Sequence, residues 1–333
     1  MVTCSYMRKT IARLALGVAL GGCFLTAAHA ADTVIGFTSN GFQIAALAEA
    51  RDGAMEEAKK KGVRIDYITA KDAADQQRAV ESLIAKHVSV IAIDPLDAVA
   101  ISESVRAANE AGIPVVMWVG SAKEGKVAAT VLSDEMTGGY DIAKWTFAKM
   151  SSGKFALLQG DKGHQAGALR EKGVRKALTE FPAITMSDYG EAKWNRDIGA
   201  RVADNFLTRT PDLKAIIALN DEMAFGAIAA MEARQWPQPM IVTGYNGQCD
   251  ALKSVLEGGK LSATLYQPFR DIGAKVVDLA VDIVAGKQVD QTVMVPSIVV
   301  DPELAKKALD ETSADISSGL RHAVKRAAAG CKS

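Results

Sequence analysis

The polar residues that could do chemistry in this chain gather where apolar runs of strand length end. The segment Ala215–Ala230 (AIIALNDEMAFGAIAA) shows the pattern: its apolar run stops at Asn220, and a helical run of small residues begins at once. Asn and Asp are preferred helix N-caps, so a cap is one explanation. The junction also predicts a ligand-contacting residue, because parallel sheets bind ligands beyond the carboxyl ends of their strands.

Other apolar runs end in comparable residues. They are followed by Ser39-Asn40-Gly41-Phe42, Asp94-Pro95, Trp118-Val119-Gly120, Gln159-Gly160-Asp161 and Gly244-Tyr245-Asn246-Gly247. Capping accounts for an Asn or Asp at each end, but not for Phe42, Trp118 and Tyr245 in a chain with only 6% aromatic residues. Amide and carboxylate groups beside flat apolar rings suit a ligand with many hydroxyls and C–H faces. The pattern predicts a site for a sugar or polyol.

Alternating strands and helices must position these residues. Strands are expected at 33–38, 63–68, 88–93, 113–119, 127–132, 154–159, 184–189, 213–219, 240–243 and 261–265. Helices are expected at 44–61, 73–86, 98–111, 165–180, 196–208, 222–234 and 250–257, and in the tail at 302–310 and 318–329. Apolar strands separated by helices predict parallel sheets covered by helices, and two such series predict two similar α/β lobes.

The first thirty residues are expected to be a secretion signal. Arg8, Lys9 and Arg13 form a basic start, residues 14–28 are apolar, and Ala28-His29-Ala30 is a cleavage site, so cleavage is expected after Ala30. Met7 is an alternative start to Met1, and Leu20-Gly21-Gly22-Cys23 loosely resembles a lipoprotein signal. Either processing route leads out of the cytoplasm.

The remaining chain has little net charge. Removal of three basic residues from 39 Lys and Arg, against 39 Asp and Glu, leaves a net charge of −3. We therefore expect no nucleic-acid partner, and no membrane span after removal of the signal. Roughly 300 residues suggest two domains. Cys249 and Cys331 remain, and either a disulfide or two free thiols fit an oxidising compartment.

Signals for an enzyme are poor. The Gly-Lys pairs at 125, 153, 259 and 286 lack a following Ser or Thr, so they form no phosphate loop. Ser151-Ser152-Gly153-Lys154 matches S-x-x-K without the companion motifs. The histidines left after the signal are scattered singly, so neither a metal nor another cofactor is expected. Asp94 with Asp161 or Asp221 is the one pair of carboxylates that suggests glycoside hydrolysis, and nothing in the sequence shows that they face each other.

Several motifs together resemble the periplasmic sugar-binding proteins of the ribose-binding type, which feed ABC importers. They are Arg51-Asp52-Gly53-Ala54, Asn220-Asp221-Glu222-Met223-Ala224, Gly244-Tyr245-Asn246-Gly247, Gly259-Lys260-Leu261 and Gln267-Pro268. The resemblance covers roughly residues 33–300. It implies two doubly wound lobes joined by a three-crossover hinge, with the ligand enclosed in the cleft by closure. One lobe would hold 31–133 and 268–296, and the other 134–267 and 297–333 with an extra helical tail.

The resemblance also nominates ligand-binding residues. Arg170 would donate to hydroxyls, with an exposed helix arginine as the alternative. Trp194 would stack on a sugar face, with a core anchor as the less favoured alternative. Asn220 and Gln267 match positions that bond hydroxyls. Tyr245 and Asn246 occupy a place where ribose binders have an aromatic residue followed by an acid.

The first lobe departs from the family pattern. Val119 and Gly120 stand where ribose binders carry an Asp-Arg pair, so charge-assisted bonds of about 1.5–3 kcal/mol each must be offset elsewhere. The available substitutes are Asp94, Ser121 and an aromatic wall of Phe42 and Trp118. The expected ligand is therefore not ribose; a linear polyol, a deoxysugar or another small hydroxylated compound fits the site as well as another aldopentose or a hexose does.

The expected function is that of a monomeric, non-enzymatic periplasmic receptor that delivers a monosaccharide or polyol to the membrane permease of an ABC importer. The alternative is a periplasmic sensor that presents a small molecule to a chemoreceptor or sensor kinase. A cytoplasmic repressor of the same fold is a third possibility, against which the signal peptide argues. The Asp301–Ser333 tail is expected to pack as a C-terminal helix, which a Cys249–Cys331 bridge would tie to the second lobe.

Overall fold

The computed structural model describes residues 33–40, 45–160 and 165–331. Several predictions concern residues outside these ranges and stay predictions: the secretion signal with its cleavage after Ala30, the choice between Met1 and Met7, Cys23, Phe42 and Asp161. Within the described ranges, no helix is long and apolar enough to cross a bilayer.

The first lobe is built on a parallel six-stranded sheet with the order β11-β5-β4-β3-β1-β2. Its strands are β1 (Val34–Asn40), β2 (Arg64–Ala70), β3 (Val90–Ile93), β4 (Val115–Trp118), β5 (Ala129–Ser133) and β11 (Thr292–Val295). The chain reverses direction through helices that cover the sheet: α1 (Ala45–Lys61), α2 (Ala73–Ala85), α3 (Ile101–Glu110) and α9 (Phe269–Val284).

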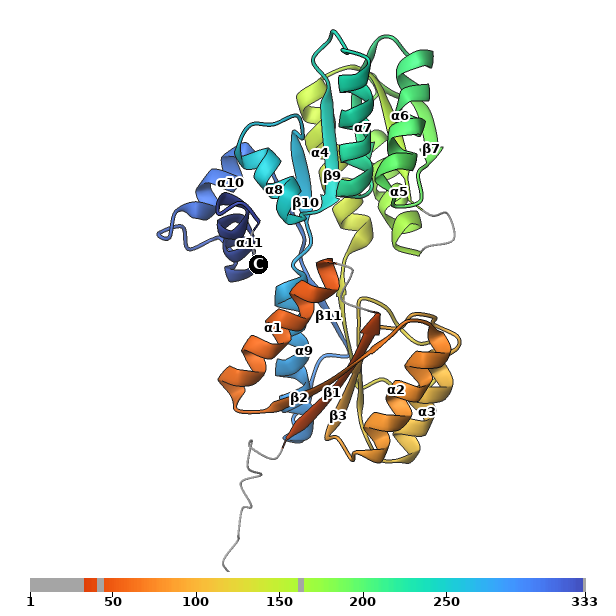
Figure 1. The fold of residues 1–333 in the computed structure, drawn as a ribbon, viewed down its shortest axis with the longest axis vertical. Helices are drawn as coiled ribbons and strands as arrows, with labels where there is room; N and C mark the ends of the chain where they lie inside the picture. Colours follow the sequence, from red (N-terminus) through yellow and green to blue (C-terminus); the bar gives the residue numbers. More distant parts are fainter. Residues whose placement is uncertain (1–32, 41–44, 161–164, 332–333) are drawn as a thin grey trace, which may run out of the picture.

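Alternation along the central strands explains why this sheet is covered on both faces. In β3, Val90 and Ala92 join the core formed with α1 and α9, whereas Ile91 and Ile93 join the core formed with α2 and α3. Figure 1 shows α1 and α9 side by side although they are distant in sequence. Their close approach requires Gly53, because a Cβ atom there would lie 2.0 Å from the carbonyl oxygen of Arg270.

The second lobe repeats the plan with the sheet order β12-β10-β9-β8-β6-β7. Its strands are β6 (Gly153–Gln159), β7 (Ile184–Glu191), β8 (Leu213–Ala218), β9 (Ile241–Asn246), β10 (Ala263–Tyr266) and β12 (Ile298–Val300), and only β12 is antiparallel to its neighbour. Its helices are α4 (Glu135–Met150), α5 (Gln165–Leu178), α6 (Arg196–Arg209), α7 (Asp221–Ala233) and α8 (Cys249–Leu256). The predicted fold of two similar, doubly wound lobes is confirmed.

Three connections join the two sheets in the described part of the chain. One follows β5, one follows β10, and one links β11 to β12. Figure 1 shows these segments running between the two lobes. Because β5 and β10 both end at such a connection, residues just after them are held close to both lobes.

A helical tail packs beside the second lobe. It contains α10 (Pro302–Leu309) and α11 (Ser318–Ala328), close to the two predicted tail helices. Leu320, Val324 and Ala327 join the core of that lobe, and a disulfide joins Cys249 to Cys331. Arg326 of α11 forms an ion pair with Glu49 of α1, so the tail also contacts the first lobe.

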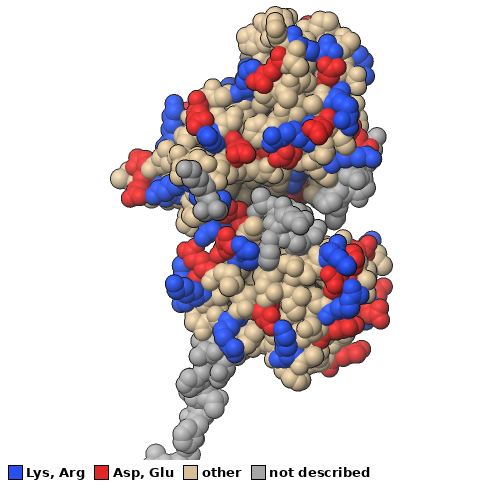
Figure 2. All heavy atoms as spheres, viewed as in Figure 1, with Lys and Arg blue, Asp and Glu red and all other residues tan. Residues whose placement is uncertain are grey.

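Most predicted elements are confirmed within a few residues, but α4, α9, β11 and β12 were not expected from the sequence pattern. All four lie at or beside the connections between the lobes. On the face shown in Figure 2, basic and acidic side chains are interspersed over both lobes rather than gathered by sign.

Candidate functional site

Gln267 is the centre of a polar cluster between the two lobes. It follows β10 directly and is 2% exposed. Its Nε2 donates to Ser133 Oγ (3.1 Å) and to Glu135 Oε1 (2.8 Å). Its Oε1 accepts from Arg170 (3.1 Å) and from Asn246 Nδ2 (2.7 Å). Because Ser133 ends β5 of the first sheet, this side chain ties the carboxyl edge of that sheet to the second lobe.

Arg170 reaches the cluster from α5 and is 6% exposed, so the alternative of an exposed helix arginine is wrong. Its Nε donates to Glu135 Oε2 (2.7 Å) and its Nη1 to the carbonyl oxygen of Leu219 (2.7 Å). The guanidinium lies 3.8 Å from the centre of the Tyr245 ring and 5.5 Å from that of Trp194. Cation–π contact and hydrogen bonds together fix its plane.

Glu135 is a member of this cluster that sequence reasoning missed. It is the first residue of α4 and accepts from Arg170, from Gln267 and from the Tyr245 hydroxyl (3.0 Å). The signal that could have found it is the polar Ser133-Asp134-Glu135 that follows an apolar run, as at the other strand ends. A buried arginine needs such a counter-charge, because an unpaired charge in the interior is costly.

Trp194 lies in the turn between β7 and α6, where its backbone has a φ of 59°. Its ring covers Gly160, at which a Cβ atom would come within 2.2 Å of the ring. The ring is partly exposed and packs at the edge of the second-lobe core. Its carbonyl oxygen accepts from Asn220 Nδ2 (3.1 Å), so the tryptophan is anchored through its backbone.

Asn220 both caps a helix and belongs to this region. Its Oδ1 accepts from the backbone N–H of Met223 (2.8 Å), which is the N-cap bond of α7. Its Nδ2 holds the Trp194 turn. Asn246 ends β9 with a φ of 106°, a strained conformation that Asn tolerates better than most residues, and this directs its amide to Gln267.

Asp221 has a role that the cap pattern did not reveal. The carboxylate is fully buried and accepts from Thr264 Oγ1 (2.6 Å) and from the backbone N–H of Gln248 (2.7 Å). Burial raises the pKa of Asp221 to about 7, against the opposing effect of these hydrogen bonds. Both oxygens of the Asp221 carboxylate are thus engaged by groups of the second lobe.

The first lobe contributes a buried carboxylate at the end of β3. Asp94 is 9% exposed, and burial raises its pKa to about 7. Trp118 differs from its predicted place: it is 1% exposed and packs in the core at 6.3 Å from Phe37, because alternation in β4 directs it toward α1 and α9. In this conformation it forms no aromatic wall of the cleft. Ser121 is exposed, and its hydroxyl donates to the carbonyl oxygen of Ala122.

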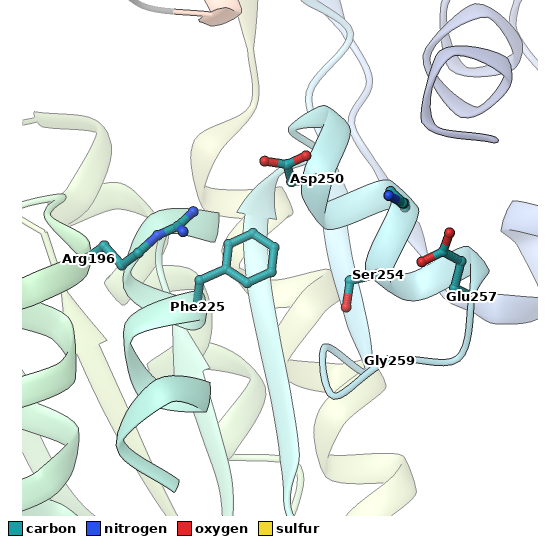
Figure 3. Close-up of a pocket in the computed structure, with 7 residues that line it drawn as sticks. Arg196, Phe225, Asp250, Ser254, Glu257 and Gly259 are labelled. Carbon is teal, nitrogen blue, oxygen red and sulfur yellow. The ribbon is translucent and has the colours of Figure 1, made fainter. Parts of the chain in front are cut away.

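Two hollows lie near this region, and the smaller one is lined in part by Asn246 and Gln267 of the cluster. One, of about 280 Å³, lies on the second lobe between α7 and α8, where Arg196 stacks on Phe225 (Figure 3). The other, of about 90 Å³, lies between the tail and the lobes and includes Glu49, Arg270 and Arg326. Among the described residues, no group of three or more His, Cys, Asp or Glu side chains is arranged to hold a metal ion.

Comparison with known proteins places the chain in a family. Residues 34–288 match the periplasmic binding protein domain. The chain is 37% identical over 248 residues to the ribose import binding protein of Bacillus subtilis, covering 74% of this chain and 80% of that protein. The solved structure of a solute-binding protein from Bacillus halodurans with bound myo-inositol is similar over 84% of this chain and 98% of its own (TM-score 0.74, 29% identity). The structure of a solute-binding protein from Actinobacillus succinogenes with bound D-allose is similar over 83% of this chain and 99% of its own (TM-score 0.76, 29% identity).

These similarities agree with the fold of two sheets in two lobes. Proteins of this kind are binding components of ABC sugar importers, and the family implies a periplasmic location. The chain belongs to the periplasmic binding protein domain family.

Proposed function

We propose that this protein is a periplasmic receptor that encloses one small polyhydroxylated ligand, a monosaccharide or polyol, and delivers it to the membrane permease of an ABC importer. The observation that carries the proposal is the cluster around Gln267, because it lies at two of the connections between the lobes. Similar proteins bind ribose, allose and myo-inositol.

In this proposal the second lobe provides the larger part of the site. Arg170, Asn220, Asn246 and Gln267 would meet hydroxyl groups, and Trp194 would cover a C–H face. The ring of Tyr245 packs against the guanidinium of Arg170 and supports it. From the first lobe, Asp94 faces the ligand and Phe42 stays a candidate.

Ligand binding would close the two lobes and would not lead to a chemical reaction. The lobes 31–133 with 268–296, and 134–267 with 297–333, would move as units about the three connections. Only a closed, liganded receptor would then engage the permease. Micromolar affinity, about −8 kcal/mol, suits such a cycle because the ligand must also be released.

Calorimetric titration and thermal-shift screening across sugars and polyols test the proposal. We expect a subset of the panel to bind with micromolar Kd and raise Tm, and small-angle scattering to show a smaller radius of gyration with ligand. Absence of binding across the panel, or conversion of a panel member into a product, would contradict the proposal.

A further inference from the structure

Asp94 has a fixed backbone and a carboxylate without a described partner. Its N–H donates to the carbonyl oxygen of Thr38 (3.0 Å), and its own carbonyl oxygen accepts from Gln76 Nε2 (2.7 Å). Pro95 follows and packs against the Gly120 position. No hydrogen bond or ion pair from the described residues reaches the side chain. The main chain therefore holds this acid in place while its carboxylate stays unsatisfied.

The carboxylate lies at the edge that faces the second lobe. β3 pairs in parallel with β1 and β4, and β4 pairs in parallel with β5, so their carboxyl ends share one edge of the sheet. Ser133 at the end of β5 bonds to Gln267 of the second-lobe cluster. A ligand held by that cluster would thus meet the edge that carries Asp94.

The charges of the site are unbalanced in a way that indicates the ligand. Arg170 is neutralised by Glu135 at 2.7 Å. Asp94 has no such counter-ion in the described chain; Tyr67 of β2 is near enough to interact electrostatically, and it is neutral because burial raises its pKa to about 12. Arg51 of α1 also interacts with Tyr67, but it forms an ion pair with Asp52 (2.6 Å). A buried carboxylate is stable only when it is paired or protonated.

We propose that the ligand carries a protonated amine, as an aminated sugar or aminated polyol, and that Asp94 is its counter-ion. The inference rests on the proposed function, since it names the class of ligand for the same cleft. An ammonium group brings a full positive charge and three N–H donors, whereas a hydroxyl brings a single weaker donor. It pairs with Asp94, a charged group of the cleft to which the described residues supply no counter-ion.

The alternative, a neutral ligand bound by a protonated Asp94, has the opposite pH dependence. Since the pKa of Asp94 is raised to about 7, its ionised fraction grows as the pH rises from 6 to 8. Affinity for an ammonium ligand should then rise about tenfold over this range, as long as the amine stays protonated. Affinity for a neutral ligand that requires the protonated acid should fall over the same range.

Matched ligand pairs test the inference. Binding is measured by calorimetry and thermal shift for 1-amino-1-deoxy-D-glucitol with D-glucitol, 2-amino-2-deoxy-D-glucose with D-glucose, and 2-amino-2-deoxy-D-galactose with D-galactose, with N-acetylated forms as uncharged controls. We expect the amine of at least one pair to bind about 10- to 100-fold more tightly than its hydroxyl and N-acetyl counterparts at pH 7.5. Its affinity should rise from pH 6 to pH 7.5.

Two variants attribute the preference to Asp94. Asp94→Asn keeps the shape of the side chain and should abolish the preference and its pH dependence while neutral ligands still bind. Glu124→Gln removes a negative charge from an exposed first-lobe residue and should change neither. The pH profile of the natural protein gives a test that does not depend on the folding of a variant.

The outcomes separate this inference from the proposed function. Neutral members that bind as tightly as their amines would overturn the inference alone and leave a sugar receptor. An amine preference that persists in Asp94→Asn would overturn the role of Asp94. If no member of any pair binds while another sugar or polyol of the wider panel does, the inference alone is overturned; absence of binding across the whole panel contradicts the proposed function as well.

Discussion

The two sheet edges that face each other in this protein are built alike but are satisfied differently. In the second lobe, Glu135, Arg170 and Gln267 bond to one another. In the first lobe, the Asp94 carboxylate lacks a described partner, and so does the buried hydroxyl of Thr38. Other side chains there are paired: the hydroxyl oxygens of Ser39 and Tyr67 lie 2.6 Å apart, and Gln76 bonds to the backbone of Asp94 and Leu96. The second lobe thus holds its polar groups in place before a ligand arrives, and the first lobe leaves positions for a ligand to complete.

Replacement of Arg170 is expected to have the largest effect, because it disrupts the bonded network of the second lobe. Arg170→Met keeps an unbranched side chain but leaves Glu135 buried without its cation. Loss of one partner of a buried ion pair costs about 3–5 kcal/mol. We therefore expect the free energy of unfolding in urea to fall by that amount, and calorimetry to show at least a 100-fold loss of affinity.

Arg196→Met is the matched control for the same lobe. Arg196 pairs with Glu222 at 2.9 Å, but both side chains are exposed, at 48% and 36%. Exposed pairs contribute at most about 1 kcal/mol, and a methionine can still cover Phe225. Equal losses of stability and affinity in the two variants would show that the buried network contributes no more than an exposed ion pair.

The disulfide gives the next largest effect. It joins residues 82 apart in sequence, from the start of α8 to the end of α11, and so links the second lobe to the tail. A bridge of this kind stabilises by about 2–4 kcal/mol, mainly by constraining the unfolded chain. We expect reductant to lower Tm in the natural protein, and we expect Cys331→Ser to lower it to a similar extent without reductant.

The Cys331→Ser variant itself should not respond to reductant, which separates loss of the bridge from other effects of the reagent. If the natural protein and the variant have the same Tm under oxidising conditions, the bridge does not contribute to stability. The second lobe would then rely on hydrogen bonds and its core alone.

Much of this arrangement could be predicted from the sequence because strand ends are marked locally. Apolar runs that stop at Asn220 or Asp94 predict both the strand and the edge at which it ends, and a parallel sheet brings such edges together. The fold follows from the same alternation. The ligand contacts themselves stay predictions.

The rest depends on packing that no local pattern encodes. α4 contains the adjacent glycines Gly138 and Gly139, which weaken a helical pattern, yet Gly139 allows close approach to the Arg170 backbone. α9 begins after Pro268 without a capping side chain. Trp118 follows the polar-end pattern but points into the core, because the face it occupies is set by the register of β4 within the sheet.

Thr264→Val removes one buried, hydrogen-bonded hydroxyl from the second lobe. Thr264 is fully buried; its hydroxyl donates to Asp221 (2.6 Å) and accepts from the backbone N–H of Gly247 (3.2 Å). The isosteric valine removes this donor, and an unsatisfied buried acceptor costs about 1–3 kcal/mol. We expect the free energy of unfolding to fall by that amount.

The pH dependence of this variant has a definite sign. The folded pKa of Asp221 is raised to about 7, so the folded state binds more protons than the unfolded state between about pH 4 and 7, and stability falls as the pH rises through that range. Because the Thr264 bond lowers this pKa, its loss should raise it further. The destabilisation by Thr264→Val should therefore be larger at pH 8 than at pH 5 in urea titrations; the reverse order would contradict the assignment to Asp221.

Thr38→Val is the same substitution in the first lobe, at a hydroxyl without a described partner, and should have the smallest effect. Thr38 is also fully buried, but its hydroxyl has no described partner. Replacement of an unpaired buried hydroxyl by a methyl group removes its desolvation cost, so stability should stay unchanged or rise by about 1 kcal/mol. The difference in urea midpoint between this variant and the natural protein should be the same at every pH. A loss as large as that of Thr264→Val would show that this hydroxyl has a partner in solution, and that the first-lobe edge is as complete as the second.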